Sequence, residues 1–291
     1  SEIIAKHSGY GIDKSIYGNN ATLMNGSAVN FTGKFQEAME FDRVNDFVNV
    51  GADASLNPIS AITIESWFKI RNGTGFTNGK TIISKSYTDG AWGGPWVVYL
   101  VRIDNLNTIE WRTTNSGGAG HAQLATVSLA YDTWYHIVTT ADGTNKIVYL
   151  NGQLVGSTPW ANTLASRTST AYIGFDDSDV DSFNGTLDEV AIWNKSLSAD
   201  TIAEHAGSKV LDYSGFGNNG TRNGSSAGPN FTVSGKFGKG LEFDGVDDYV
   251  SLKNETGILN GSSKATVEAW INPKSGFADS DYRAIYYTST S

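Results

Sequence analysis

Two aspartates in a short turn are the first residues in this sequence that could do chemistry. Asp42 and Asp46 lie in MEFDRVNDFVNV, residues 39–50, where apolar and polar residues alternate on both sides of the turn. Calcium takes about six to eight oxygen ligands from carboxylates and carbonyls, which loops at a sheet edge can supply. We expect Asp42 and Asp46 to bind calcium or, alternatively, to cap the turn by accepting backbone hydrogen bonds.

An acidic loop is a second candidate for calcium. The segment FDDSDVDS alternates carboxylates with other residues, and its carboxylates belong to Asp176, Asp177, Asp179 and Asp181. It lacks the glycine and the terminal glutamate of an EF-hand loop. A solvated acidic loop is the simpler interpretation.

Aromatic residues in loop-like segments are candidates for binding sugars, with an apolar ring face and polar neighbours for the hydroxyls. Trp92 lies in DGAWGGPW and Trp160 in STPWAN. We expect both to contact a ligand, together with Tyr87 and His121, and further neighbours are Asp89, Trp96 and Trp111. The alternative is that these tryptophans fill the rim of the fold.

The turn that holds Asp42 and Asp46 occurs twice, which determines how the chain is organised. LEFDGVDDYVSL, residues 241–252, matches residues 39–50 at a constant offset of 202 residues. DKSIYGNNAT from Asp13 matches DYSGFGNNGT from Asp212, and TIESWFKI from Thr63 matches TVEAWINP from Thr266. The offsets of these two matches are 199 and 203 residues, respectively. Such small differences from 202 indicate loop insertions between two copies of one domain of about 200 residues.

The ends of the chain extend this pattern. SEIIAKH at residues 1–7 resembles ADTIAEH at residues 199–205. We therefore predict that residues 1–12 are the tail of a preceding repeat and a linker. Residues 13–205 would form a complete domain and residues 206–291 the N-terminal part of a second one. The chain would then be a piece of a longer tandem array, and the alternative is one domain with an unrelated extension.

Apolar periodicity predicts strands throughout. The turn at residues 39–50 is predicted to join a half-buried β-hairpin, and residues 62–69 carry apolar groups on both faces, as a strand inside a two-sheet stack does. Further strands are expected at residues 80–86, 95–103, 108–114, 134–140, 147–157, 171–177 and 185–194. Asn151-Gly152 suits a type I′ turn. Ser198 is the predicted N-cap of a short helix.

Composition excludes several classes of protein. A formal charge of −9 without clustered Lys or Arg argues against nucleic acid binding. No apolar run approaches the roughly 20 residues of a membrane helix. Aromatic residues at 12%, with 33 Gly and only 5 Pro, favour an all-β fold with many turns.

Glycosylation acceptors are frequent and cysteine is absent. Asn-X-Ser/Thr occurs at Asn20, Asn25, Asn30, Asn72, Asn184, Asn194, Asn219, Asn223, Asn230, Asn254 and Asn260. Secreted eukaryotic modules commonly use disulfides. We therefore expect a glycosylated prokaryotic protein of the cell surface or the extracellular space.

Five motifs in a fixed order resemble the laminin-G-like family of concanavalin A-like jelly rolls. They are DKSIYGNNAT, MEFDRVNDFV, TIESW, WYHIVTTADGTNKIVYLNG and LDEVAIWNKSLS. The resemblance covers residues 13–205 and, as the first part of a second copy, residues 206–291. It implies an all-β, antiparallel two-sheet jelly-roll sandwich with a partial second copy, often with bound calcium.

The resemblance also assigns individual residues. Asp188 and Glu189 lie on the strand whose family counterparts are near the Asp42 turn, so they join the calcium candidates. Trp67, Trp134 and Trp193 fall in strand motifs and are expected in the core. Arg43 and Asn45 stand where the second copy has Gly245 and Asp247, which weakens a metal role for the first copy.

Catalysis has little support. Glycoside hydrolases of this fold carry E-x-D-x-x-E on one strand, which the sequence lacks, and adjacent Asp188 and Glu189 would point to opposite faces. With no Cys and four His, nucleophilic triads have few candidate members. His136, beside Trp134 on a strand, is expected to be structural. We expect no enzyme.

These observations favour a binding or adhesion module of a multi-repeat surface protein that recognises glycans or extracellular proteins through rim loops. The alternative is a structural subunit of a surface layer, sheath or filament, in which neighbouring repeats or copies of the chain pack on one another. A noncatalytic domain attached to a hydrolase is a third interpretation.

Overall fold

The computed structural model divides the chain into two compact units, Ser1–Lys209 and Val210–Ser291. It describes residues 3–73, 80–87, 97–176, 182–210, 212, 218–224, 230–236, 238–252, 264, 266–273, 284–285 and 287. Trp92, Trp96 and Asp89 lie outside these residues, as do Asp177, Asp179, Asp181, Asn254 and Asn260.

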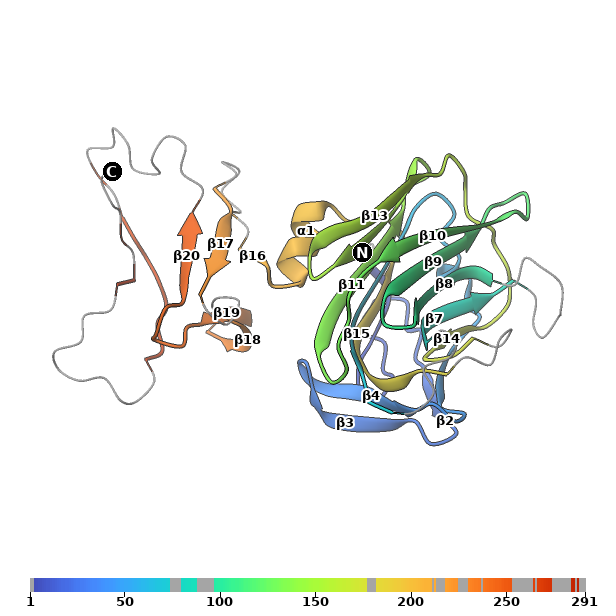
Figure 1. Ribbon diagram of the computed structural model, residues 1–291, viewed down its shortest axis with the longest axis horizontal. Coiled ribbons are helices and arrows are strands. Elements are labelled where there is room, and N and C mark those ends of the chain that lie inside the picture. Colours follow the sequence, from blue (N-terminus) through green and yellow to red (C-terminus); the bar gives the residue numbers. More distant parts are fainter. Residues whose placement is uncertain are drawn as a thin grey trace. The chain divides into compact units, whose positions relative to one another are not determined.

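The first unit contains an eight-stranded antiparallel sheet in the order β13-β12-β11-β6-β15-β4-β3, with β1 paired to β15 (Figure 1). Its strands are β1 (Ile3–His7), β3 (Ala28–Gly33), β4 (Gln36–Asp42), β6 (Ile62–Ile70), β11 (Trp134–Ala141), β12 (Asn145–Leu150), β13 (Gln153–Pro159) and β15 (Asn184–Trp193). β6 is central and almost wholly buried, as its two apolar faces predicted.

A seven-stranded antiparallel sheet runs in the order β10-β9-β8-β7-β14-β5-β2. Its strands are β2 (Thr22–Met24), β5 (Phe47–Gly51), β7 (Lys80–Ser86), β8 (Val97–Asp104), β9 (Thr108–Thr114), β10 (Gly120–Thr126) and β14 (Ala171–Ile173). One core cluster takes side chains from both sheets, including Phe68 of β6 and Trp111 of β9. This arrangement confirms the predicted all-β, two-sheet sandwich.

The turn at Asp42–Asp46 does not join a hairpin, so that prediction was wrong. β4 pairs with β3 and β15, whereas β5 pairs with β2 and β14 in the other sheet. The chain crosses between sheets here because Phe41 and Val48, both 0% exposed, must enter the core from opposite sides. Alternation alone does not distinguish such a crossing from a hairpin.

The N-terminal segment belongs to the first unit, unlike the predicted boundary at residue 13. Ile3–His7 forms β1 on β15, and Ile4 and Ala5 are part of the core cluster. The matched segment Ala199–His205 is instead the helix α1. The two segments therefore share apolar spacing and differ in structure, since tertiary pairing recruits the first one as a strand.

Local signals predicted several turns correctly. Asn151 and Gly152 have φ values of 50° and 79°, which a type I′ turn requires. Ser198 caps α1 by accepting the N–H of Thr201. A short 3-10 helix, η1 (Ala54–Leu56), is capped by Asp53. Within the described ranges, no helix combines the length and the hydropathy that crossing a membrane requires.

The second unit contains two small sheets, β16-β17-β20 and β18-β19. Its strands are β16 (Lys209–Val210), β17 (Gly220–Asn223), β18 (Asn230–Gly235), β19 (Gly238–Glu242) and β20 (Tyr249–Leu252). The β18–β19 pairs repeat those of β3–β4 at an offset of 202 residues: Asn230 faces Glu242 as Ala28 faces Glu40. The turn between β19 and β20 repeats as well, because Asp248 accepts the N–H of Asp244 at 2.9 Å as Asp46 accepts that of Asp42 at 2.8 Å.

Asp13 anchors the loop that follows β1. Its carboxylate accepts the backbone N–H groups of Lys6, Ser15 and Asn19 at 2.9, 2.8 and 2.7 Å and the Ser15 hydroxyl at 2.6 Å. Burial pushes the pKa of this carboxyl upward, but these hydrogen bonds outweigh burial and lower it. Asp212 accepts the N–H of Asn218 at 2.8 Å in the matching segment.

We expect Asp13→Asn to lower the free energy of unfolding by about 3 kcal/mol at pH 7, because an amide cannot accept all of these hydrogen bonds. The folded pKa is lowered, so this stability is present above the unfolded value and is lost as pH falls through the folded one. Urea denaturation between pH 3 and 7 measures the difference. Asp53→Asn, which changes an exposed cap, is the control, and an equal loss in both variants would contradict the assignment.

Candidate functional site

The described aromatic candidates for ligand binding lie mostly inside the fold. Trp160 is 3% exposed and belongs to the core cluster, so its prediction as a loop ligand was wrong. Trp111 is fully buried, with its indole N–H donated to the Thr140 carbonyl at 3.0 Å. His121 is exposed, and its ring lies 6.5 Å from that of Trp160. The alternative was that these tryptophans fill the rim of the fold, and both Trp111 and Trp160 are buried within the core cluster.

A buried lysine lies between the Trp160 and Trp111 side chains and the neighbouring strands. Lys146 Nζ lies 5.9 Å from the Trp160 ring and 5.2 Å from the Trp111 ring. It donates to the Trp111 and His121 carbonyls at 2.9 and 2.7 Å, and it thereby ties β12 of one sheet to β9 and β10 of the other. Burial lowers the pKa of Lys146 to about 7.

Tyr87 lies under the guanidinium of Arg167. The Arg167 Cζ atom is 3.9 Å from the centroid of the Tyr87 ring, and an Arg167 N–H donates to the Tyr87 hydroxyl. One face of the ring is therefore already covered.

The predicted calcium set does not form one site. Asp42 is the last residue of β4 and pairs with Asn184 of β15, whereas Asp188 is four residues farther along β15, about 13 Å away. Asp46 is 2% exposed, and its Oδ2 accepts the N–H of Asp42 as a turn cap does. Burial raises the pKa of the Asp46 carboxyl.

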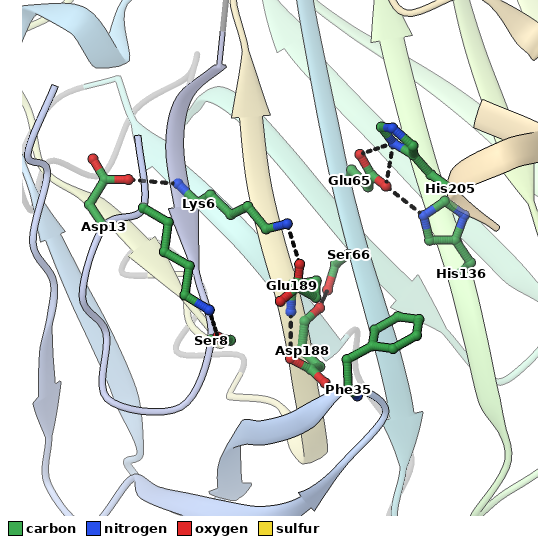
Figure 2. A network of polar contacts seen from close by, with 11 residues as sticks. Lys6, Ser8, Asp13, Phe35, Glu65, Ser66, His136, Asp188, Glu189 and His205 are labelled. Carbon is green, nitrogen blue, oxygen red and sulfur yellow. Dashed lines mark hydrogen bonds and ion pairs between the residues drawn. The ribbon is translucent and has the colours of Figure 1, made fainter. Parts of the chain in front are cut away.

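Asp188 and Glu189 hold neighbouring segments in place (Figure 2). Asp188 Oδ2 accepts the N–H of Phe35 at 2.8 Å, Oδ1 accepts the N–H of Glu189 at 2.8 Å, and Glu189 forms an ion pair with Lys6. Glu189 has a φ of 49°, at a bulge where β15 changes register. Burial raises the pKa of Asp188 to about 6. Both residues are engaged in structural contacts.

A compact group of carboxylates occurs in the second unit. One ligand oxygen from each of Asp244, Asp247 and Asp248 lies within 4.8 Å of the others, and the Asp248 Oδ1 atom is buried without a hydrogen-bond partner among the described residues. In the first unit Asn45 replaces the middle aspartate. Of the acidic loop, the structure describes only Asp176, which is 1% exposed.

Three tryptophans expected in the core lie on the outer face of the eight-stranded sheet, the face that also carries Thr63, Glu65 and Lys69. Trp67 contacts the Phe35 and His136 rings, Trp193 contacts the His205 ring, and Trp134 lies under Lys69. None of the three belongs to the core cluster between the sheets. Neighbouring residues of a strand point to opposite faces of the sheet. Ile64 and Phe68 of β6 point into the core, so Trp67 points outward, and Trp134 and Trp193 lie opposite outward residues of β6.

Glu65 links helix α1 to this outer face. Its Oε1 atom lies 2.9 Å from His136 Nε2 and 3.0 Å from His205 Nδ1, so the carboxylate sits between two imidazoles (Figure 2). Burial opposes ionisation of Glu65, but the bonds from His136 and His205 outweigh it and hold the pKa of the carboxyl well below its usual value. His136 is fully buried, which agrees with a structural role.

A polar pocket of ≈ 190 Å³ opens on the same outer face. It is lined by Asn30, Glu40, Lys69, Arg71, Asp132, Gly185 and Thr186. Gly185 has a φ of 141°, and a Cβ there would meet the Lys69 carbonyl at 2.0 Å, so only glycine allows the strands to approach this closely. Sequence reasoning missed these residues as a site, and of them it named only Asn30, as a glycosylation acceptor. The sequence feature that could have identified them is the set of polar residues that alternate with apolar ones along each strand. This alternation shows that they face away from the core, but it does not show which strands are adjacent.

The described glycosylation acceptors differ in their surroundings. Asn20, Asn25, Asn72 and Asn194 are exposed, whereas Asn184, Asn219 and Asn223 are partly buried. Asn30 is also partly buried, and its amide donates to Glu40 at 2.9 Å. The side chain of Asn230 lies outside the described residues. Glycosylation stays a prediction.

Comparisons with known proteins agree with the sandwich. The Laminin_G_3 model, described as the concanavalin A-like lectin/glucanases superfamily, matches residues 19–203. No curated protein matches the sequence. The binding domain of Paraclostridial Mosquitocidal Protein 1 superposes with a TM-score of 0.59 at 12% identity, over 88% of this chain and 72% of that domain. The botulinum neurotoxin serotype G binding domain superposes with a TM-score of 0.54 at 18% identity, over 83% of this chain and 65% of that domain.

A third similar structure comes from an enzyme. Domain 4 of AbnA, a GH43 extracellular arabinanase from Geobacillus stearothermophilus solved with arabinotriose, gives a TM-score of 0.55 at 15% identity. The match covers 70% of this chain and 98% of that domain. At these identities, the likeness shows the fold.

We expect Glu65→Gln to loosen helix α1, because the neutral amide keeps one acceptor oxygen in place of two and forms weaker hydrogen bonds with the imidazoles than a carboxylate does. The free energy of unfolding of the first unit should fall by about 2 kcal/mol. Hydrogen exchange of the α1 amides should accelerate more than that of β8 and β9, whose buried amides exchange only through unfolding of the whole unit. Asp104→Asn on the other sheet is the control. Unaltered exchange in α1 would show that apolar packing of Ile202 alone holds the helix.

Proposed function

Because the chain belongs to the concanavalin A-like lectin/glucanase superfamily, we propose that it is a noncatalytic binding module that recognises glycans or proteins outside the cell. The observation that carries this proposal is the polar pocket on a rigid sheet face. Glu40 is held there through both oxygens, Oε1 by Arg71 and Oε2 by Asn30, which favours a role in shaping the pocket over one in proton transfer. The likeness to toxin binding domains and to domain 4 of an extracellular arabinanase supports a binding role and an extracellular location.

A structural role is the second candidate, and the second unit favours it. Phe243 and Trp270 are 46% and 67% exposed, whereas the matching Phe41 and Trp67 are 0% and 8% exposed. The identical strand registers support the proposal that this unit is a partial copy of the first. Apolar residues in such positions need further strands to cover them. Packing between repeats or between copies of the chain would supply these strands.

The first test of recognition is titration calorimetry of the full chain with neutral trisaccharides, beginning with arabinotriose. We expect saturable binding and intact sugar after prolonged incubation, because Glu40 is paired with Arg71 and leaves Asp132 as the only unpaired carboxylate among the described residues of the pocket lining, whereas glycoside hydrolysis uses two. The chain after heat denaturation is the control. Release of shorter sugars would overturn the noncatalytic assignment, and the absence of binding to any glycan would leave protein recognition or the structural role.

We also propose calcium binding at the turn of the second unit. Three carboxylates within 4.8 Å, one with a buried unpartnered oxygen, fit a cation that prefers oxygen ligands. The first unit has only Asp42 and Asp46 at the matching turn, with Asn45 between them.

We expect calcium titration to give one site in the wild type and none in Asp247→Asn. Asn45→Asp is the matched variant, since it creates the same three carboxylates in the first unit and should add a second site. Calorimetry after chelator treatment counts the sites. An unchanged stoichiometry in Asp247→Asn would show that this turn does not bind the metal.

A further inference from the structure

Four side chains on the outer face of the eight-stranded sheet form one row. Glu40 of β4 lies opposite Thr186 of β15, Thr186 lies opposite Lys69 of β6, and Lys69 lies opposite Trp134 of β11. Adjacent strands are spaced by about 4.8 Å, so the row extends across the strands for about 14 Å. This length accommodates two to three linked sugar rings.

The row leads from the polar pocket to an aromatic ring. Lys69 lines the pocket, and its Nζ atom lies 5.1 Å from the centroid of the Trp134 ring. Trp134 is only partly buried, so the indole is within reach of a ligand that occupies the pocket. The lysine has a flexible four-carbon stem and can move off the ring when a sugar takes its place.

The chemistry of the pocket suits hydroxyl groups. Lys69 offers N–H donors, Thr186, which is 3% exposed, offers a hydroxyl, and Asp132 offers an exposed carboxylate that no described residue hydrogen-bonds. Arg71 is paired with Glu40, which fixes its guanidinium at the wall. Donors and acceptors therefore both line a space of ≈ 190 Å³, and the several hydroxyls of one sugar ring need both.

The charges of the pocket cancel. Arg71 and Glu40 form one pair of opposite charges, and Lys69 and Asp132 contribute one charge each. An anionic sugar would gain from Lys69 and lose against Asp132, so the pocket gives it no net attraction. A neutral sugar meets no such opposition.

We propose that this row is the glycan-binding site, with a neutral sugar ring in the pocket and the next ring of the same glycan stacked on Trp134. The inference rests on the proposed function and places it on the sheet face and not on the rim loops. Thr186 and Asp132 bond the hydroxyls, Trp134 contacts the apolar face of the second ring, and the Arg71–Glu40 pair positions the wall.

The test uses the full chain and a panel of neutral trisaccharides (arabinotriose, xylotriose, cellotriose and mannotriose) beside trigalacturonate. Binding of the wild type is compared with that of Trp134→Ala, Thr186→Val and Asp132→Asn. We expect affinity to fall by about tenfold or more for Trp134→Ala and by roughly fivefold for the other two. Thr186→Val keeps the shape of the side chain, and Asp132→Asn keeps a residue type that tolerates the φ of 57° at this position.

Rim variants separate this inference from the proposed function. Tyr87→Phe and His121→Ala should leave affinity unchanged, and thermal unfolding checks that every variant is folded. Binding by the wild type that the pocket variants retain, or that the rim variants lose, overturns the site and leaves glycan recognition standing. Binding of trigalacturonate alone overturns the neutral-sugar assignment. A wild type that binds no member of the panel overturns glycan recognition and the site together.

Discussion

The apolar interface between the two sheets is the constraint on which the rest of the structure depends. Each strand presents alternate residues to it, so a shift of one residue would expose Phe41 or Phe68 and bury their polar neighbours. The chain crosses from one sheet to the other at the Asp42–Asp46 turn because both flanking strands must reach this interface. Because alternate residues of each strand point into this interface, the residues between them must point outward.

Polar groups that face away from the core show how the outer face is divided. Glu65 and Asp188 are covered by α1 and by the loop at Phe35, and both carboxylates are satisfied by hydrogen bonds. A buried carboxylate without such partners would cost several kcal/mol. Elsewhere on this face Thr186, Lys69 and Asp132 line a pocket, in which Asp132 is exposed, Lys69 is partly buried and Thr186 is 3% exposed. Coverage by a helix or a loop therefore separates structural carboxylates from groups available to a ligand.

Much of the fold was predictable from local pattern. Alternation identified β6 and β11, Asn151-Gly152 identified its turn, and Ser198 identified the start of α1, because each depends on residues close in sequence. The candidate site was not predictable in the same way. Trp160 has a loop-like sequence context, yet Lys146 and the core enclose it. Trp134 has a strand context, yet its phase turns it outward.

The sequence by itself determined the all-β class, the family motifs and the capping chemistry of the turns, because strand periodicity and turn residues act over a few positions. Only the tertiary structure decided which strands are neighbours. It separated Asp42 from Asp188 and aligned Glu40, Thr186, Lys69 and Trp134, which are far apart in the chain. Strand order and register arise from packing across the whole sandwich, and no local run of residues encodes them.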